Sequence, residues 1–350
     1  MVFDKQYYDS TWPGQGVHRH DYCPYWANRL VDEFKPKRVL DIGTGCGHLV
    51  KLLRERGVDA WGVDSSEYAL ANCCAPGFVL NASVTDLPFK DDSFDVVFSN
   101  GLWEYVEEKD VRKGRDEVWR VGARQHHEID HDKCDYMPEF VTWKSLDWWN
   151  EKLAAPKVLV SCPTHRSKEY AHDAWLAMTR TIDYPNYEVF VVDNSPTPDC
   201  AKRWGFAWMG DRYPDALNMG QCERMGRSMQ IAQDKFLAEG FEWWFNVEID
   251  VIPAPQMLKT LIKHGRGADW TAHVYPARGG DIECSSGIGC TLWSRKLIED
   301  FRFESMGDQT GHCVDAYLWH KCIFPNTAKY PTRELWGHVP TKHLKEPDNG

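Results

Sequence analysis

The sequence predicts an α/β protein of two domains, each a largely parallel sheet covered by helices. In both halves of the chain, short apolar runs alternate with amphipathic stretches, the pattern of strands that alternate with helices. The series of strands begins again shortly after residue 157, and 350 residues are more than one ordinary hydrophobic core accommodates. We therefore predict one domain over residues 1–153 and a second over residues 154–350, joined without a long linker.

The elements of the first half follow from their residue types and their boundaries. Residues 38–42 form an apolar run, and residues 48–56 after them have the apolar spacing of a helix. Residues 94–99 form another apolar run, set between Asp-Asp-Ser and Asn-Gly, which favour turns. The predicted strands are 38–42, 60–63, 78–80, 94–99 and an edge strand at 125–129, with helices at 48–56 and 110–121.

The second half repeats this order of elements. Residues 158–161 are an apolar strand, and residues 188–192 are a second one that ends at Asp193. Residues 243–247 form a further strand that runs into Glu248-Ile249-Asp250. Helices are predicted at 169–180 and, as a long element, at 221–239.

Composition excludes several classes of protein. The formal net charge is −11 and no cluster of Lys and Arg is present, which argues against a general nucleic-acid-binding surface. The twelve Cys have no paired C-x-x-C or Cys/His zinc spacing, so reduced thiols are expected. The N-terminus lacks the features of a signal peptide, and no apolar run reaches the roughly 18 residues that span a bilayer. We expect a cytoplasmic location.

A glycine-rich segment marks a candidate ligand site in the first half. Residues 41–47, Asp-Ile-Gly-Thr-Gly-Cys-Gly, follow a predicted strand and open a helix. Glycines there allow a sharp turn and close approach to a ligand, and the helix start offers free N–H groups. Asp64 ends the next strand, where a carboxylate can accept ribose hydroxyls.

With residues 86–89 and 92–97 following in order, this half resembles class I S-adenosylmethionine-dependent methyltransferases over about residues 1–150. The resemblance implies a Rossmann-like fold and S-adenosylmethionine as cofactor. It implies that Asp64 contacts the ribose of the cofactor, that Ser83 and Val84 lie beside its adenine, and that Asn100 lies where the fourth strand ends. The residues that it assigns to the methionine end of the cofactor are Asp41, Gly43, Gly45 and Gly47.

Two departures from that family bear on activity. Ser83 stands at an adenine-side position that is commonly acidic in the family. Residues 139–149 resemble the segment after the fifth strand of the family, yet the next domain begins almost at once. The domain is therefore predicted to be shortened, without the last two strands of the family sheet, and cofactor binding is favoured over methyl transfer. A Rossmann-like domain that holds no cofactor is the alternative, because fold and motif do not prove activity.

The segment 127–131, His-Glu-Ile-Asp-His, matches the H-E-x-x-H pattern of zinc proteases. That chemistry needs both histidines on one face of a helix, with the Glu near a zinc-bound water. The segment lies between a predicted strand and a turn-rich stretch and has no apolar helical stripe. A polar loop at the ligand edge of the sheet is the better interpretation.

The second half carries a different set of polar residues at predicted strand ends. Pro163 and Thr164 follow its first strand, and Asp193 ends its second. Glu248 and Asp250 follow a later strand, where two acidic residues can hold a divalent ion that bridges diphosphate oxygens. Taken singly, Asp250 is also explained as the cap of a turn before Pro253, Asp315 as a helix N-cap and His338 as an ordinary packed histidine.

These motifs resemble family 2-like inverting glycosyltransferases with the GT-A fold, over about residues 156–342. The order of several elements agrees with that family, including residues 184–189, 192–195, 248–255, 287–290, 313–318 and 336–339. The resemblance implies a nucleotide-sugar donor and Mn²⁺ or Mg²⁺. It implies that Asp250 and His338 are metal ligands and that Asp315 is the general base. The residues that contact the nucleotide sugar would be Pro163, Thr164, Asp193, Arg227 and Glu248.

The leading hypothesis from sequence is therefore a metal-dependent glycosyltransferase fused to a shortened methyltransferase-like domain. Its partners would be a nucleotide sugar and an acceptor hydroxyl on a glycan, a lipid-linked molecule, a protein or a modified nucleic-acid base. Two alternatives remain open. In the first, the chain is a bifunctional enzyme that also methylates the sugar or its acceptor. In the second, it is an inactive scaffold that binds nucleotides.

Overall fold

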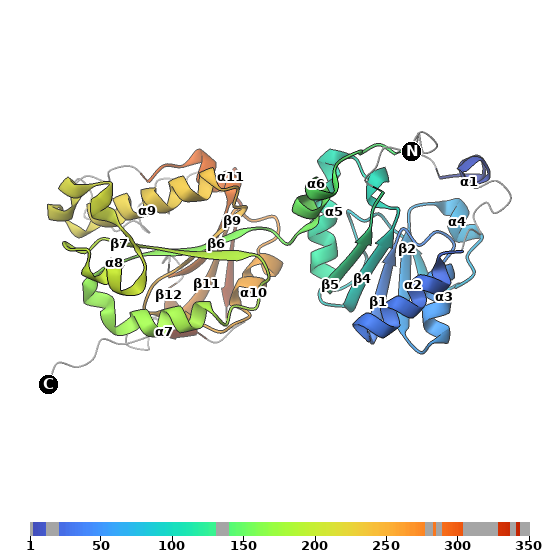
Figure 1. Cartoon of the computed structure of the whole chain (residues 1–350), viewed down its shortest axis with the longest axis horizontal. Helices are drawn as coiled ribbons and strands as arrows, with labels where there is room; N and C mark the ends of the chain where they lie inside the picture. Colours follow the sequence, from blue (N-terminus) through green and yellow to red (C-terminus); the bar gives the residue numbers. More distant parts are fainter. Residues whose placement is uncertain are drawn as a thin grey trace. The chain divides into compact units, whose positions relative to one another are not determined.

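The computed structural model describes residues 3–11, 21–130, 140–276, 283–284, 289–303, 328–336 and 341–343. The chain divides into two compact units, Met1–Ala155 and Pro156–Gly350, and each is described by itself (Figure 1). Each unit is a sheet with helices on its faces, as expected for an α/β protein. None of the helices in the described part of the chain is both long enough and apolar enough to cross a membrane.

Unit 1 contains a five-stranded sheet in the order β3-β2-β1-β4-β5. Every neighbouring pair in this sheet is parallel, which makes the fold Rossmann-like. The chain moves outward from β1 to β3 and then crosses to β4, so the direction of winding reverses between β1 and β4. The strands are β1 (Arg38–Ile42), β2 (Asp59–Asp64), β3 (Val79–Asn81), β4 (Phe94–Asn100) and β5 (Gly122–Glu128).

Alternating residues of these strands face two separate layers of helices. Val39 and Val96 belong to a core cluster with α2 and α3, whereas Leu40 and Val97 belong to a cluster with α5 and α6. This alternation is what buried parallel strands require, because successive side chains point to opposite faces. The helices are α1 (Lys5–Thr11), α2 (Cys23–Arg29), the π-helical turn Leu30–Phe34, α3 (His48–Glu55), α4 (Glu67–Ala71), the 3₁₀ turn η3 (Trp103–Tyr105), α5 (Glu108–Val121) and α6 (Leu146–Leu153).

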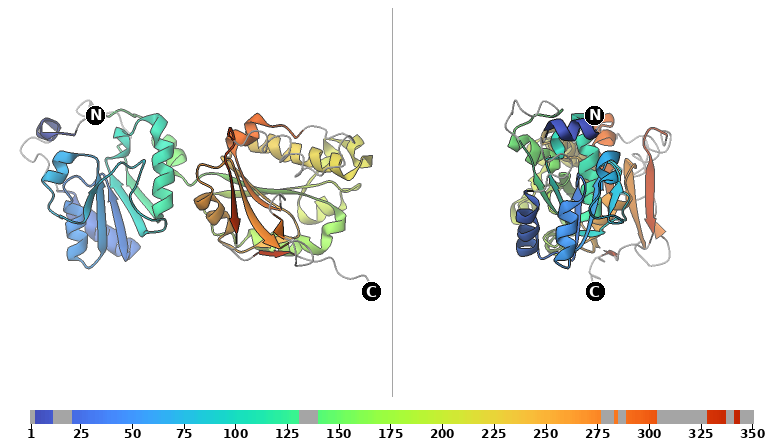
Figure 2. Two further views of the ribbon diagram at one scale, coloured as in Figure 1. Left: turned by 180° about the vertical axis from the view of Figure 1, so that it is seen from behind. Right: turned by 90° about the vertical axis from the view of Figure 1, so that its right-hand side faces the viewer.

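Unit 2 contains a larger, mixed sheet in the order β12-β11-β13-β9-β6-β7-β8, with β14 paired to β11. Strands β9, β6, β7 and β8 are parallel, and β13 runs antiparallel to both β9 and β11 (Figure 2). A separate antiparallel pair joins β10 (Val251–Pro253) to β15 (Thr341–His343). The sheet strands are β6 (Val158–Thr164), β7 (Tyr187–Asp193), β8 (Ala207–Trp208), β9 (Trp243–Val247), β11 (Trp270–Pro276), β12 (Glu283–Cys284), β13 (Cys290–Ser294) and β14 (Thr332–Trp336).

Tryptophan is a core residue of this sheet. Trp244 of β9 lies opposite Trp293 of β13, and Trp293 lies opposite Trp270 of β11, so three fully buried indoles line one face. They pack with α9 and α11, while α7 and α10 cover the other face. The helices are α7 (Glu169–Thr179), α8 (Asp199–Trp204), α9 (Gln221–Ala238), α10 (Met257–His264) and α11 (Arg295–Asp300), with 3₁₀ turns at Arg166–Lys168, Met209–Asp211 and Pro214–Asn218.

Candidate functional site

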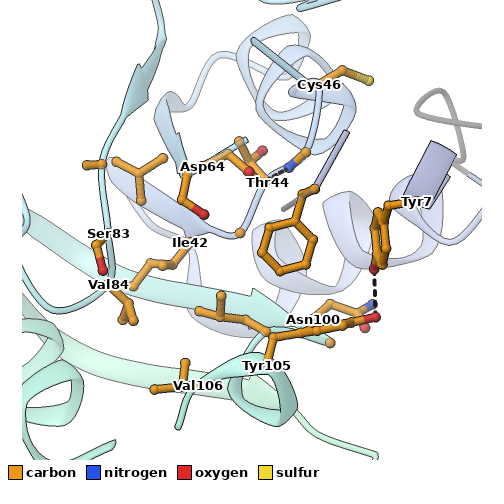
Figure 3. A pocket seen from close by; sticks show the side chains of 18 of the residues that line it. Tyr7, Ile42, Thr44, Cys46, Asp64, Ser83, Val84, Asn100, Tyr105 and Val106 are labelled. Atoms are coloured by element: carbon orange, nitrogen blue, oxygen red, sulfur yellow. Dashed lines mark hydrogen bonds between the residues drawn. The ribbon is translucent and has the colours of Figure 1, made fainter. Parts of the chain in front are cut away.

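A pocket of about 830 Å³ opens at the carboxyl edge of the unit 1 sheet (Figure 3). It is lined by the loops after β1, β2, β3 and β4, and by the segment before β1. This is where the winding of the sheet reverses, which is the place where open parallel sheets bind ligands. Its volume is within the roughly 300–1,000 Å³ of ligand sites in proteins.

The glycine-rich loop forms the floor of this pocket. Gly43 and Gly45 line it and have φ angles of +73° and +58°, in the left-handed region that disfavours residues with a Cβ. A Cβ on Gly43 would lie 3.1 Å from Leu102 Cδ1, so the Leu102 side chain after β4 packs closely against the loop backbone. Glycine at both positions allows this conformation, and the backbone there faces the cavity without side chains.

Asp64 at the end of β2 is held by this loop. Its Oδ2 accepts a hydrogen bond from the Gly45 amide at 2.8 Å, and its Oδ1 accepts one from the Ser66 amide at 2.8 Å. Burial raises the pKa of Asp64, while the amides of Ser66, Gly45 and Ser65 oppose that shift. Asp64 lines the pocket and is oriented by fixed donors, as a ribose-binding carboxylate must be.

Asp41 and Gly47 lie behind the loop and are not among the pocket-lining residues. Asp41 is 4% exposed and accepts a hydrogen bond from Thr44 Oγ1 at 2.5 Å. Burial raises the pKa of Asp41 to about 7. A Cβ on Gly47 would lie 2.8 Å from Val79 Cγ2, so this glycine serves packing against β3. The resemblance implied that both residues contact a cofactor, but neither of them lines the pocket.

The two ends of the pocket differ in chemistry. Ser83 and Val84 line one side, after β3, where the Ser83 hydroxyl lies 2.9 Å from Thr85 Oγ1 (Figure 3). Asn100, at the end of β4, also lines the cavity. Five of the seven residues expected at a cofactor site therefore share one pocket, and these are Gly43, Gly45, Asp64, Ser83 and Asn100.

The other side of the pocket is a wall of aromatic rings. The hydroxyl of Tyr7 in α1 donates a hydrogen bond to the hydroxyl of Tyr105 in η3 at 2.7 Å. Phe3 packs edge-on against both rings, with centroids 5.0 Å from Tyr7 and 5.4 Å from Tyr105. Phe140 packs edge-on against Tyr105 at 4.9 Å. We call Phe3, Tyr7, Tyr8, Tyr105 and Phe140, all of which line the pocket, the aromatic wall.

Sequence reasoning missed the aromatic wall. Phe3, Tyr7 and Tyr8 precede the first strand, in a segment without a periodic apolar pattern or a motif. The density of aromatic residues between positions 3 and 8 was the available signal, and it does not by itself indicate a ligand.

His127 lies on strand β5, not on a helix. Its Nδ1 lies 2.8 Å from Ser99 Oγ, and burial lowers its pKa to about 3, so it is neutral at physiological pH. A zinc-protease site needs a helix at this position, and β5 pairs instead with β4 in a parallel ladder. His131 lies outside the described residues.

Unit 2 brings several of its predicted residues to one edge of its sheet. Strand β6 lies between β7 and β9, so Thr164, Asp193 and the residues after Val247 meet at the carboxyl ends of three adjacent parallel strands. The Asn194 amide donates to the Thr164 carbonyl at 2.9 Å, and the Arg166 amide donates to Ser195 Oγ at 2.8 Å. The winding of this sheet also reverses here, between β6 and β9.

Asp193 is 0% exposed and holds its own loop together. Its Oδ1 accepts hydrogen bonds from the Ser195 amide at 2.9 Å and from Ser195 Oγ at 2.5 Å, and its Oδ2 accepts from the Ala201 amide at 3.0 Å. Thr164 is also buried, with Oγ1 2.8 Å from His172 Nε2. Both side chains therefore shape the loops, and the contact with a nucleotide that the resemblance implied for them stays a prediction.

Asp250 pairs with a lysine at this edge. It is 1% exposed, and its Oδ2 lies 2.5 Å from Lys168 Nζ and 3.3 Å from the Tyr170 hydroxyl. Glu248, two residues earlier, is half-buried, and its amide donates to the Gly289 carbonyl at 2.9 Å.

The remaining predicted residues of unit 2 are less informative. Pro163, the last but one residue of β6, is half-buried. Arg227 on α9 forms an ion pair with Glu223 on the same helix, at 2.9 Å, and its guanidinium lies 5.1 Å from the centre of the Tyr213 ring. Asp315 and His338 lie outside the described residues, so their predicted roles stay predictions.

Comparison with known proteins gives similarities in unit 1. Residues 40–125 match the model of a family described as "Methyltransferase domain". A demethylmenaquinone methyltransferase of Thermus thermophilus is 36% identical over 111 residues, 28% of this chain and 49% of that protein. A second, from Clavibacter sepedonicus, is 39% identical over 103 residues, 27% of this chain and 40% of that protein. The chain spans half or less of the length of these two relatives.

Among solved structures, the YcgJ protein of Bacillus subtilis is 24% identical, with a TM-score of 0.32 over 38% of this chain and 66% of that one. A Pyrococcus horikoshii protein is 22% identical, with a TM-score of 0.31 over 35% of this chain and 66% of that one.

Proposed function

We propose that the N-terminal unit, a class I S-adenosylmethionine-dependent methyltransferase domain, binds this cofactor in the pocket and methylates a planar aromatic acceptor held by the aromatic wall. The observation that carries the proposal is one cavity that joins a glycine-rich loop and Asp64 to five aromatic side chains. The methylating part of this proposal goes beyond the sequence analysis, which favoured binding.

The residues of the pocket fit S-adenosylmethionine. A carboxylate offers about four acceptor positions, so the amides of Gly45, Ser66 and Ser65 leave Asp64 able to accept from a ribose hydroxyl. The bare backbone at Gly43 and Gly45 lets the methionine end approach closely. Val84 offers an apolar surface to adenine. We infer from these residues that the adenosine half lies toward β2 and β3.

The transferable methyl group then lies toward β4 and the aromatic wall. Rings that meet edge to face leave flat apolar surfaces on which another planar ring packs well. Two relatives are named for methylating demethylmenaquinone, and an aromatic acceptor of that kind suits this wall.

Held by Asp64 and the glycine-rich loop, S-adenosylmethionine would supply an electrophilic methyl group, which would pass to an electron pair of the acceptor as the carbon–sulfur bond broke, leaving S-adenosylhomocysteine and releasing the proton of the acceptor to water. The protein contributes the relative positions of donor and acceptor. Asp64 and the glycine-rich loop hold the donor, and the aromatic wall holds the acceptor ring in line with it.

Calorimetry with S-adenosylmethionine and S-adenosylhomocysteine tests the first half of the proposal on the full chain. A panel of hydroxynaphthoquinones, phenols and aliphatic alcohols, with radiolabelled methyl donor, tests the second half. We expect both cofactor forms to bind and label to enter aromatic acceptors. Absence of cofactor binding would refute a methyltransferase, whereas binding without any labelled product would favour the inactive scaffold.

We further propose that unit 2 transfers a sugar from a nucleotide-sugar donor, with Mn²⁺ or Mg²⁺ at Asp250. The reversal of winding between β6 and β9 supports a nucleotide site at this edge. Asp250 Oδ2 is paired with Lys168 Nζ at 2.5 Å, so an ion there would have to displace this ammonium group. Mg²⁺ commonly takes one or two carboxylates and completes its shell with water and substrate phosphates. Calorimetry with UDP, GDP and dTDP sugars, with and without Mn²⁺, tests the proposal. Metal-dependent binding of one nucleotide supports it, and none in any combination refutes it.

A further inference from the structure

The fold brings together three soft metal ligands that the sequence keeps apart. Cys46 lies in the glycine-rich loop, His48 is the first residue of α3, and Cys74 follows α4. The sulfur and ring-nitrogen atoms of these three side chains all lie within 4.8 Å of one another. We propose that Cys46, His48 and Cys74 bind a zinc ion that fastens the glycine-rich loop to the turn after α4.

The backbone already holds the two cysteines in register. The Cys74 amide donates to the Cys46 carbonyl at 2.9 Å, and Cys74 Sγ donates to the same oxygen at 3.1 Å. A Cβ on Gly47 would lie 3.3 Å from Ala75 Cβ and 3.6 Å from Cys73 Sγ, so loop and turn are in close contact. The group therefore rests on packed backbone and not on exposed side chains that meet by chance.

The geometry suits zinc after small adjustments. Zn–S and Zn–N bonds of about 2.3 and 2.0–2.1 Å in a tetrahedral site place ligand atoms roughly 3.5–3.8 Å apart. The present separations of up to 4.8 Å shorten to that value if the ligand atoms move by about 1 Å. Rotations about the side-chain bonds of Cys and His allow such movements. Three protein ligands leave a fourth position for water or for Cys73, the half-exposed neighbour of Cys74.

Charge and ligand type select the metal. Thiolate and imidazole ligands favour zinc, whereas Mg²⁺ and Mn²⁺ prefer oxygen ligands. Each thiol releases its proton to water on binding, so two protons leave for each zinc ion, and two thiolates balance its charge. A neutral unit is acceptable in a partly buried place. This site is independent of the oxygen-ligand metal proposed at Asp250 in unit 2.

Metal analysis of the full chain, purified under a reducing agent and dialysed against a chelator, tests the proposal. We expect one tightly bound zinc per chain and, after replacement by Co²⁺, the thiolate-to-metal absorption band that carboxylate sites lack. Cys74→Ser, which leaves the pocket lining intact, and His48→Ala should each weaken zinc binding by about 100-fold or more. The matched control is Cys200→Ser in unit 2. The Cys200 thiol is buried and donates a hydrogen bond to Glu169 Oε1 at 3.0 Å.

Several results would overturn the proposal. Unchanged zinc affinity in Cys74→Ser would contradict it. Loss of zinc in His131→Ala but not in Cys74→Ser would also contradict it, because the ion would then belong to the H-E-x-x-H segment. A wild-type chain without stoichiometric zinc, or a Co²⁺ form without the thiolate band, would also refute it. The last two measurements need no variant, so a poorly folded Cys74→Ser leaves the test decisive. Zinc should also raise the Tm of the wild-type chain and not that of Cys74→Ser.

Discussion

The Gly45 amide donates a hydrogen bond to Asp64 Oδ2 across 2.8 Å, which ties the loop after β1 to the end of β2. The carboxylate is thereby aimed at the pocket before any ligand arrives. Preorganisation of this kind reduces the entropy lost on binding. The pair therefore leads to a prediction about cofactor affinity.

Asp64→Asn should weaken S-adenosylmethionine binding by about 10- to 100-fold, since a hydrogen bond to a charged group contributes roughly 1.5–3 kcal/mol. The amide side chain also turns a donor toward one of the backbone N–H groups that Asp64 now satisfies. Isothermal titration calorimetry measures the change. Asp59→Asn is the control: this residue begins the same strand and pairs with Arg38 and Arg54 at the surface. Equal losses in both variants would contradict the assignment.

Gly43→Ala should impair cofactor binding more than Gly57→Ala. Both glycines have positive φ, +73° and +83°, so both variants carry the same backbone strain of about 1–2 kcal/mol. Only at Gly43 does the new methyl group meet a neighbour, at 3.1 Å from Leu102 beside the pocket, whereas nothing lies within 4 Å at Gly57. We expect an affinity loss on the order of 10-fold for Gly43→Ala alone. Similar affinities in the two variants would show that the loop backbone does not contact the donor.

The sequence was sufficient for the framework of unit 1. The strand predicted at 38–42 is observed at Arg38–Ile42, and that at 94–99 extends by one residue to Asn100. Residues 41–47 and Asp64 were predicted from a glycine run between a strand and a helix, from the carboxylate at the end of the next strand and from the order of the segments after them; Asp41 and Gly47 are not among the pocket-lining residues. Contacts between residues far apart in the sequence could not be predicted in this way. Cys46 and Cys74 are 28 positions apart, and only the docking of the turn after α4 on the loop brings their sulfurs together.

The roles of single carboxylates were harder to predict. Asp193 and Asp64 both end parallel strands, and a sequence shows the same polar residue in both places. In the structure, both carboxylates accept hydrogen bonds from backbone amides through both oxygens. Asp64 nevertheless lines a pocket, whereas Asp193 is fully buried. The strands β11 and β13 were not predicted either, since their apolar runs lie beside glycine-rich segments without helical spacing between them.

Tyr7→Ala should raise the KM for the acceptor and leave the affinity for S-adenosylmethionine nearly unchanged. The ring of Tyr7 is part of the aromatic wall, and an aromatic pair contributes about 0.5–1.5 kcal/mol beyond its buried area. Tyr7→Phe keeps the ring and removes the hydroxyl that donates to Tyr105, so most of the activity should remain. Tyr25→Ala, 59% exposed and away from the pocket, is the control. Initial rates at saturating donor separate these cases, and a loss of donor affinity in Tyr7→Ala would contradict the division of the pocket.

Asp41 should make the free energy of unfolding depend on pH. Burial raises its pKa from 3.8 to about 7, so between those values the folded state holds a proton that the unfolded state has released. Stability from this group is therefore greatest below pH 4 and is lost as pH rises to about 7. Asp41→Asn keeps an acceptor for Thr44 and removes the titration, so its unfolding free energy should fall less between pH 5 and pH 8 than that of the wild type. Urea unfolding at both pH values measures the difference, and parallel changes would contradict a raised pKa.

Lys168→Met should increase the affinity of unit 2 for Mn²⁺ by about 10-fold, because the ammonium group that now pairs with Asp250 at 2.5 Å competes with a cation for the same oxygen. Methionine fills a similar volume without charge. Leaving a carboxylate buried without its cation costs about 3–5 kcal/mol, so the variant should unfold at a lower temperature, and Mn²⁺ should restore much of the loss. Thermal unfolding with and without Mn²⁺ measures both effects, with the exposed Lys202→Met of α8 as the control. If Mn²⁺ leaves the melting temperature of Lys168→Met unchanged, Asp250 is a structural partner of Lys168 and not a metal ligand.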